Sequence, residues 1–172
     1  MSRAVMLSIR PKWVEKIANG EKTIEVRKTK PKLETPFKCY IYCTLPKYPH
    51  EDFIATDYLR PQFYGGGKVI GEFVCDCITP LYNVCMDDWK RLAGGLHNIE
   101  KELVNQACLT EAKLHTYAGG KNCFAWHISD LLIYDQPKGL DEFTRLRETK
   151  FGSEPVTIKR PPQSWCYVEA MK

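Results

Sequence analysis

A helix stop that leads directly into an alternating segment constrains the fold of this chain more than any other feature. Pro11 suits the first turn of a helix, and Asn19-Gly20 is a typical helix terminator. Ile24 and Val26 then alternate with polar residues, which predicts a short strand whose apolar side chains face the core. The sequence therefore predicts an early helix that is joined to a strand by a tight turn.

Three charged residues cluster where this turn meets the strand. Glu25 and Arg27 share the face opposite Ile24 and Val26, and Lys22 lies at the turn beside them. Two cations around one carboxylate suit a site for a small polar or anionic group. Ordinary surface charges at the start of a strand are the alternative interpretation, and the local pattern leaves both open.

Each of these side chains offers a defined chemistry. Arg27 presents a planar fork that suits a phosphate or a base edge. Lys22 is a point charge for a phosphate, or for an oxyanion that forms at an acyl carbon. Glu25 can accept a hydrogen bond from an exocyclic amine, act as a general base, or hold the two cations in place. We take Lys22 and Glu25 as candidate catalytic residues, and all three as candidate ligand-binding residues.

The rest of the pattern predicts an α+β fold dominated by strands. Strands with helices at one side favour a small, partly closed β-barrel with flanking helices. The further expected elements are strands at 6–9, 37–44, 68–78, 123–134 and 164–168, and helical pieces at 87–92, 99–107 and 111–117. Thr110 is expected to cap the last helix.

We expect one domain over residues 1–172. Within it, residues 86–118 form a helical insert and residues 45–67 form a long loop rich in Pro, Gly and Tyr. Residues 136–172 form a C-terminal extension that returns to the barrel.

Composition limits the classes of function. A formal net charge of +4 is too small for nucleic-acid binding driven by overall charge, although a local basic patch such as 28–32 remains compatible. No apolar run approaches the roughly 20 residues that span a bilayer. The first ten residues lack the pattern of a signal peptide. We therefore expect a cytoplasmic protein with no membrane partner.

The eight cysteines are expected to be mostly buried thiols. None is spaced as C-x-x-C, and nothing in the pattern points to secretion. Cys39 with Cys43, and Cys75 with Cys77, would each share one face of a strand, so a zinc site remains an alternative. We predict no metal and no cofactor.

The charged cluster is part of a longer motif. Gly20, Lys22, Glu25 and Arg27 have the spacing G-x-K-x-x-E-x-R, directly after an amphipathic helix. This motif resembles that of ASCH domains, which belong to the PUA-like superfamily of small β-barrels. The similarity to bacterial and phage-type ASCH proteins also covers residues 7–13, 71–73, 126–131 and 160–168.

The resemblance implies a PUA-like barrel with a cleft beside the first helix, lined by the motif residues and binding RNA or a nucleotide. Some relatives are enzymes: one branch removes the acetyl group from acetylated cytidine with a lysine and a threonine, and another is ribonuclease-like. Lys22 matches that lysine, whereas Glu25 stands at the threonine position. An enzymatic activity on a nucleoside or RNA substrate therefore stays open.

Ser8, Trp126 and His127 complete the candidate ligand-binding residues. Ser8 precedes the first helix and can either cap it or reach the cleft. Trp126 can stack on a base, and because His127 points to the opposite face, one of the two is expected in the site. The alternatives are a core position for Trp126 and a structural role for His127. Further aromatic candidates for stacking are Tyr117, Trp165 and Tyr167.

Three functions are compatible with these observations. The leading hypothesis is a monomer that binds RNA or a modified nucleoside in the polar cleft. The second is a hydrolase of acylated nucleosides, or a ribonuclease. The third is a protein-interaction module, in which the motif serves stability and the loop at 28–32 or at 45–67 binds a partner.

Overall fold

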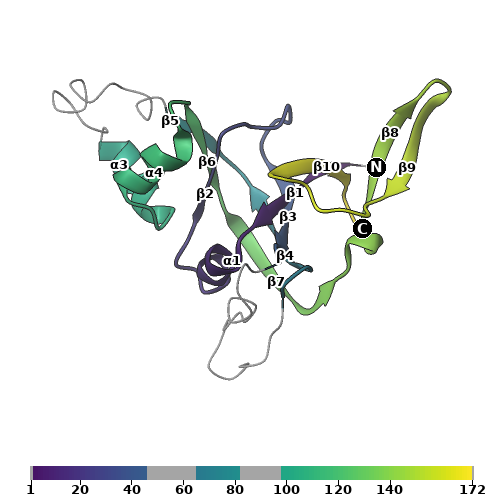
Figure 1. The fold of residues 1–172 in the computed structure, drawn as a ribbon, viewed down its shortest axis with the longest axis horizontal. Coiled ribbons are helices and arrows are strands. Elements are labelled where there is room, and N and C mark those ends of the chain that lie inside the picture. The colour runs from purple at the N-terminus through teal and green to yellow at the C-terminus, as the bar shows by residue number, and fades with distance from the viewer. Residues whose placement is uncertain (1, 46–64, 82–97, 172) are drawn as a thin grey trace.

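The computed structural model describes residues 2–45, 65–81 and 98–171. Its largest element is a five-stranded sheet (Figure 1). The strands follow the order β10 (Trp165–Glu169), β1 (Arg3–Ile9), β3 (Phe37–Cys43), β4 (Val69–Cys75) and β7 (Ser129–Lys138). β1 and β3 are parallel, and all other neighbours are antiparallel.

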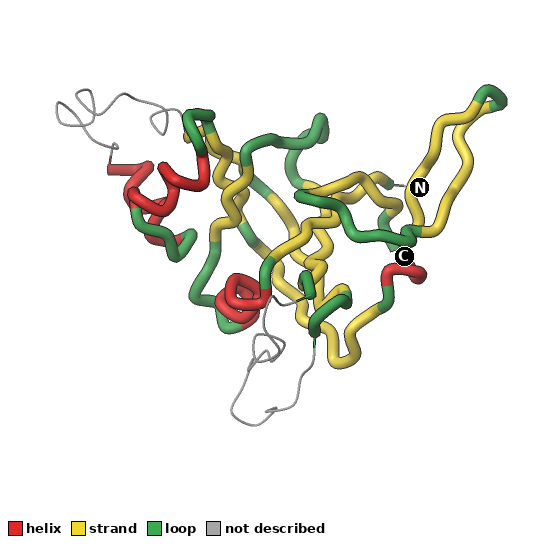
Figure 2. The backbone as a smooth tube through the Cα atoms, viewed as in Figure 1, coloured by secondary structure: helices red, strands yellow, loops and turns green. Residues whose placement is uncertain are grey.

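A second, three-stranded sheet carries the charged motif. β2 (Ile24–Arg27) pairs with β6 (Cys123–His127), and β6 pairs with β5 (Ile78–Leu81), both antiparallel. β8 (Thr144–Thr149) and β9 (Gly152–Thr157) form a hairpin that projects away from both sheets (Figure 2). The mixed α+β fold is confirmed. The described strands hydrogen-bond as three sheets and do not close one barrel, so a partly closed barrel stays a prediction.

Two predicted strands are split between the sheets. The expected strand 68–78 ends in the large sheet as β4, and the chain then enters the small sheet as β5. The expected strand 123–134 leaves the small sheet at Ile128 and continues in the large sheet as β7. The bend has a backbone cause, since Asp130 adopts a φ of +46° and Ile128 N–H donates to Thr23 O at 2.9 Å. The prediction of one continuous strand is wrong in both cases.

The first predicted helix is confirmed as α1 (Pro11–Ala18). Pro11 occupies its first turn, and Val14 and Ile17 are buried. Gly20 adopts a φ of +74°, in the left-handed region that favours glycine, and Gly20 N–H donates to Ile17 O at 3.0 Å. This turn places Lys22 directly before β2, which lies at the edge of the small sheet.

Two further helices cover the small sheet (Figure 1). α3 (Asn98–Gln106) and α4 (Glu111–Ala118) bury Val104 and Leu114 in one cluster with Ile24 and Val26. The helices predicted at 99–107 and 111–117 are thereby confirmed, whereas the piece at 87–92 lies outside the described residues, as does most of the 45–67 loop. A short 3-10 helix, η3 (Leu140–Glu142), precedes β8. The helices of the described part are too short or too polar to cross a membrane.

The larger core cluster lies where α1, the five-stranded sheet and β6 meet. It contains Val14 and Ile17 of α1, alternate residues of β1, β3 and β4, and Trp126 of β6. Trp126 has no exposed surface and packs edge-on against Phe37, with ring centroids 5.9 Å apart. This core fixes α1 and β6 in place, and β6 in turn pairs with β2.

The N-cap of α4 gives a test of the fold next to the site. Thr110 Oγ1 accepts a hydrogen bond from Lys113 N–H at 3.2 Å. We expect Thr110→Ala to lower the free energy of unfolding by about 1 kcal/mol, because it leaves that N–H without its cap. Thr110→Ser keeps the hydroxyl and is the matched control. Urea unfolding followed by circular dichroism measures both, and equal stability of the two variants would contradict the cap.

Candidate functional site

The three charged motif residues are buried together. Lys22, Glu25 and Arg27 expose only 3%, 7% and 6% of their surfaces. Because β2 alternates, Ile24 and Val26 face α3 and α4, and Glu25 and Arg27 point to the other side. The interpretation of these residues as ordinary surface charges is therefore wrong.

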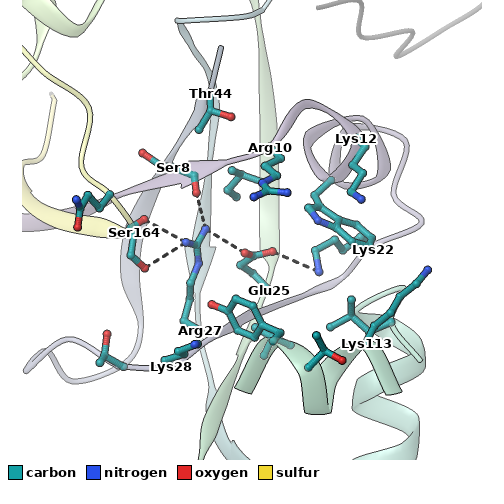
Figure 3. A pocket seen from close by; sticks show the side chains of 18 of the residues that line it. Ser8, Arg10, Lys12, Lys22, Glu25, Arg27, Lys28, Thr44, Lys113 and Ser164 are labelled. Atoms are coloured by element: carbon teal, nitrogen blue, oxygen red, sulfur yellow. Dashed lines mark hydrogen bonds and ion pairs between the residues drawn. The ribbon is translucent and has the colours of Figure 1, made fainter. Parts of the chain in front are cut away.

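Glu25 lies between the two cations (Figure 3). Lys22 Nζ lies 3.3 Å from one carboxylate oxygen, Oε2, and Arg27 Nη2 lies 3.0 Å from the other, Oε1. Each oxygen of the carboxylate thus has its own cationic partner. A carboxylate at this depth is costly without such pairing, so the three residues form one structural unit.

The remaining hydrogens of Lys22 are directed to the protein. Lys22 Nζ donates to Ile24 O at 2.7 Å and to Ala107 O at 2.9 Å. With the Glu25 ion pair, the ammonium group has three protein partners. Ala107 follows the last residue of α3, so Lys22 also joins this helix to β2.

Arg27 joins β2 to two other segments. Arg27 Nη2 donates to Ser8 O at 2.9 Å, and Arg27 Nη1 lies 3.2 Å from Ser164 O and 3.3 Å from Ser164 Oγ. Arg27 Nε is buried and has no acceptor within the described part of the chain. Arg27 therefore holds β1 and the segment before β10 around the carboxylate.

A cleft of about 1010 Å³ opens above this unit. Its walls come from the start of α1, the end of β2, α4 and the segment before β10, and Lys22, Glu25 and Arg27 form its floor. Most of its charged groups are cations. The charged lining residues are Arg10, Lys12, Lys22, Arg27, Lys28 and Lys113, with Glu25 as the one carboxylate among the described lining residues.

Four predicted site residues meet at the cleft: Ser8, Lys22, Glu25 and Arg27. Ser8 does not cap α1, because its hydroxyl donates to Pro162 O at 2.6 Å and α1 has no side-chain cap. Ser8 instead lines the cleft and supplies the backbone oxygen that Arg27 contacts.

Trp126 and His127 do not line the cleft. Trp126 belongs to the core, where its ring centroid also lies 6.1 Å from that of Trp165. His127 lies on the other strand face, half-exposed, with Nδ1 2.6 Å from Asp76 Oδ1. The expectation that one of the two belongs to the site does not match this geometry, because Trp126 is buried in the core and His127 pairs with Asp76 on the opposite face.

The cleft contains two aromatic side chains, Trp13 and Tyr117. Tyr117 was among the aromatic candidates, and partial burial raises its pKa. Trp13 is not among the candidate residues from the sequence. It is half-buried next to the exposed Lys12, and this position at the edge of the apolar side of α1 is the signal that indicates a partly exposed aromatic.

The basic loop after β2 contributes to the rim. Lys28 and Thr29 line the cleft, and Thr29 Oγ1 accepts a hydrogen bond from Trp165 Nε1 at 2.9 Å. The start of this basic loop therefore borders the site. Lys113 and Thr116 of α4 are further lining residues that lie more than 80 positions away in sequence, and no local pattern links them to the motif.

The described residues contain no cluster of three or more His, Cys, Asp or Glu side chains placed to hold a metal ion. Cys39 and Cys75 are buried, and burial raises the pKa of both thiols, to about 12 for Cys75.

Comparison with known proteins bears on the fold. No family model matches the sequence, and no curated protein shows significant similarity to it. An ASCH protein from Zymomonas mobilis, solved by crystallography, aligns over 96% of this chain and 87% of its own, with a TM-score of 0.54 and 19% identity. This chain has the fold of an ASCH domain. A mutant of the same protein aligns over 96% of this chain and 90% of its own, with a TM-score of 0.51 and 18% identity.

The local structure of this chain explains the position of the motif. α1, the tight turn and the edge strand β2 bring Lys22, Glu25 and Arg27 to one cleft. At this level of identity the similarity concerns the fold, and the chemistry of the cleft has to be argued from the residues of this chain.

Removal of Lys22 tests the buried unit. We expect Lys22→Met to lower the free energy of unfolding by about 3–5 kcal/mol, because it leaves Glu25 with one cation and two carbonyl oxygens without donors. The matched control is Lys16→Met, which breaks an exposed pair with Glu21 and should change stability little. Urea unfolding measures both variants, and similar small losses would show that the buried unit contributes little to stability.

Proposed function

We propose that this chain is an ASCH-family protein that binds RNA, or a nucleotide or modified nucleoside, in the cleft above Lys22, Glu25 and Arg27. The observation that carries the proposal is the composition of the lining, where six cations surround one carboxylate and two aromatic side chains. A ligand for such a cleft is negatively charged and contains a flat ring. Nucleotides and RNA have both properties.

The cations at the rim support contact with phosphate. Arg10, Lys12, Lys28 and Lys113 line the cleft from three different segments, and the deeper cations are occupied by protein acceptors. Phosphate groups bind through mobile, solvated cations of this kind, which position the ligand without reading its sequence. The small overall charge of the chain is compatible with this proposal because the cations are gathered in one place.

The aromatic side chains support contact with a base. Lys12 Nζ and Lys22 Nζ lie 5.0 and 5.3 Å from the centroid of the Trp13 ring, and Lys28 Nζ lies 5.2 Å from that of Tyr117. Aromatic rings beside cations hold single-stranded RNA by stacking and charge together.

Binding is better supported than hydrolysis by Lys22. Nucleophilic or base catalysis needs an amine that is free to react, whereas Lys22 donates to two backbone carbonyls and is paired with Glu25. We therefore prefer a binding function for this protein over the two alternatives, an acylated-nucleoside hydrolase and a ribonuclease. With this proposal we expect four further properties: one domain, a partly closed PUA-like barrel, a monomeric state and a cytoplasmic location.

Loss of a rim cation tests the proposal. We expect Lys28→Ala to weaken binding of a labelled single-stranded RNA octamer, and to lower the slope of log affinity against log salt by about 1, because one phosphate contact is lost. Fluorescence anisotropy over a range of salt concentrations measures both quantities.

Lys150→Ala is the matched control, because Lys150 is an exposed lysine in the turn between β8 and β9, outside the cleft. Its affinity and salt slope should equal those of the wild type. Equal effects of the two substitutions, or no binding of RNA or nucleoside monophosphates by the wild type, would contradict a binding site in this cleft.

A further inference from the structure

The two cations of the motif have little capacity left for a ligand. Lys22 donates two hydrogen bonds to backbone carbonyls and forms an ion pair with Glu25. Arg27 donates to Ser8 and Ser164 and also forms an ion pair with Glu25. Its buried Nε–H has no acceptor within the described residues. Lys22 and Arg27 therefore act first as partners of Glu25.

Glu25 keeps the capacity that its partners have lost. An ionised carboxylate accepts about four hydrogen bonds, and Lys22 and Arg27 supply one cationic contact to each oxygen. Each oxygen can thus accept one more bond. Glu25 lines the cleft and its side chain exposes 10% of its surface, so a ligand at the floor can reach it.

The neighbouring hydroxyl has the same polarity. Ser8 Oγ donates its hydrogen to Pro162 O, which leaves the oxygen of Ser8 as an acceptor. The polar floor beside the carboxylate therefore offers acceptors. A ligand that presents a carbonyl oxygen there would face Glu25 without a donor between them, which is unfavourable.

We propose that Glu25 recognises the exocyclic amino group of a cytosine- or adenine-type base, with Lys22 and Arg27 as positioning residues that hold its carboxylate in place. This inference rests on the proposed function, because it assumes a base in the cleft. The amino group donates to the carboxylate of Glu25, which lines the cleft. The site thereby selects amino bases against their oxo counterparts.

Two matched nucleotide pairs test this selectivity. CMP and UMP differ by an amino group against an oxo group, and AMP and IMP differ in the same way. We expect the amino member to bind at least tenfold more tightly in whichever pair binds better, measured by isothermal titration calorimetry at one salt concentration. Sites built around a hydrogen bond to a ligand N–H reject analogues that lack it, because the buried acceptor is left unpaired. Equal affinities, or a preference for the oxo member, would overturn the inference.

Glu25→Gln tests the assignment to this side chain. We expect the amino-to-oxo ratio of affinities to fall below threefold, because the amide offers a donor as well as an acceptor. Glu34→Gln, an exposed carboxylate outside the cleft, is the matched control and should keep the wild-type ratio. A folded Glu25→Gln protein that keeps the wild-type ratio would overturn the role of Glu25.

A third ligand covers the case in which Glu25→Gln fails to fold. CMP or AMP with a dimethylated amino group has no N–H on that group, so its affinity for the wild type should fall to that of the oxo member. Undiminished affinity would overturn the inference.

Failure of the proposed function and failure of this inference give different results. If no nucleotide or RNA binds, the proposed function falls and this inference with it. If the nucleotides bind equally and Lys28→Ala weakens them, the function stands and the inference falls.

Discussion

The pairing of one buried carboxylate with two cations is the interaction on which the rest of the site depends. Glu25 is removed from water, and such a group is tolerated because Lys22 and Arg27 each contact one of its oxygens. The same cations reach Ala107 after α3 and Ser8 in β1. One ionic cluster thus connects helices, sheet and C-terminal segment around the floor of the cleft.

This cluster divides the cleft into two electrostatic regions. The floor contains cations that are already bonded to the protein, and it presents the acceptors of Glu25 to a ligand. The rim contains Lys28 and Lys113, which are exposed and suited to phosphate. A nucleotide has the same division, with a polar base at one end and a phosphate at the other. The two regions differ because the floor cations are bonded to protein groups, whereas the rim cations are exposed to a ligand.

The sequence predicts the local parts of this arrangement well. Pro11, Gly20 and the alternation of Ile24 and Val26 predict α1, its end and the orientation of β2, because each depends on backbone rules within a few residues. The burial of the charges could not be predicted in this way. The partner of Lys22 at Ala107 lies 85 positions away.

The aromatic residues of the cleft could be predicted from the sequence only in part. Trp126 is a candidate from the sequence because an aromatic ring can stack on a base, yet it packs in the core with Phe37. Trp13 and Tyr117 line the cleft instead, from two helices whose relative position depends on tertiary packing. Alternation and helical spacing give the faces of single elements, whereas the identity of the residues that meet across a cleft depends on how the elements assemble.

The most direct measurement is nitrogen-15 NMR of the wild-type protein during titration with CMP. The account predicts shifts of the Arg27 Nε–H and Trp13 Nε1–H signals, because both side chains line the cleft. Trp126 Nε1–H, which is buried in the core, should stay unchanged and serves as the internal control. Shifts gathered on the β8–β9 hairpin, with the Arg27 signal unmoved, would contradict the central claim that this cleft is the binding site.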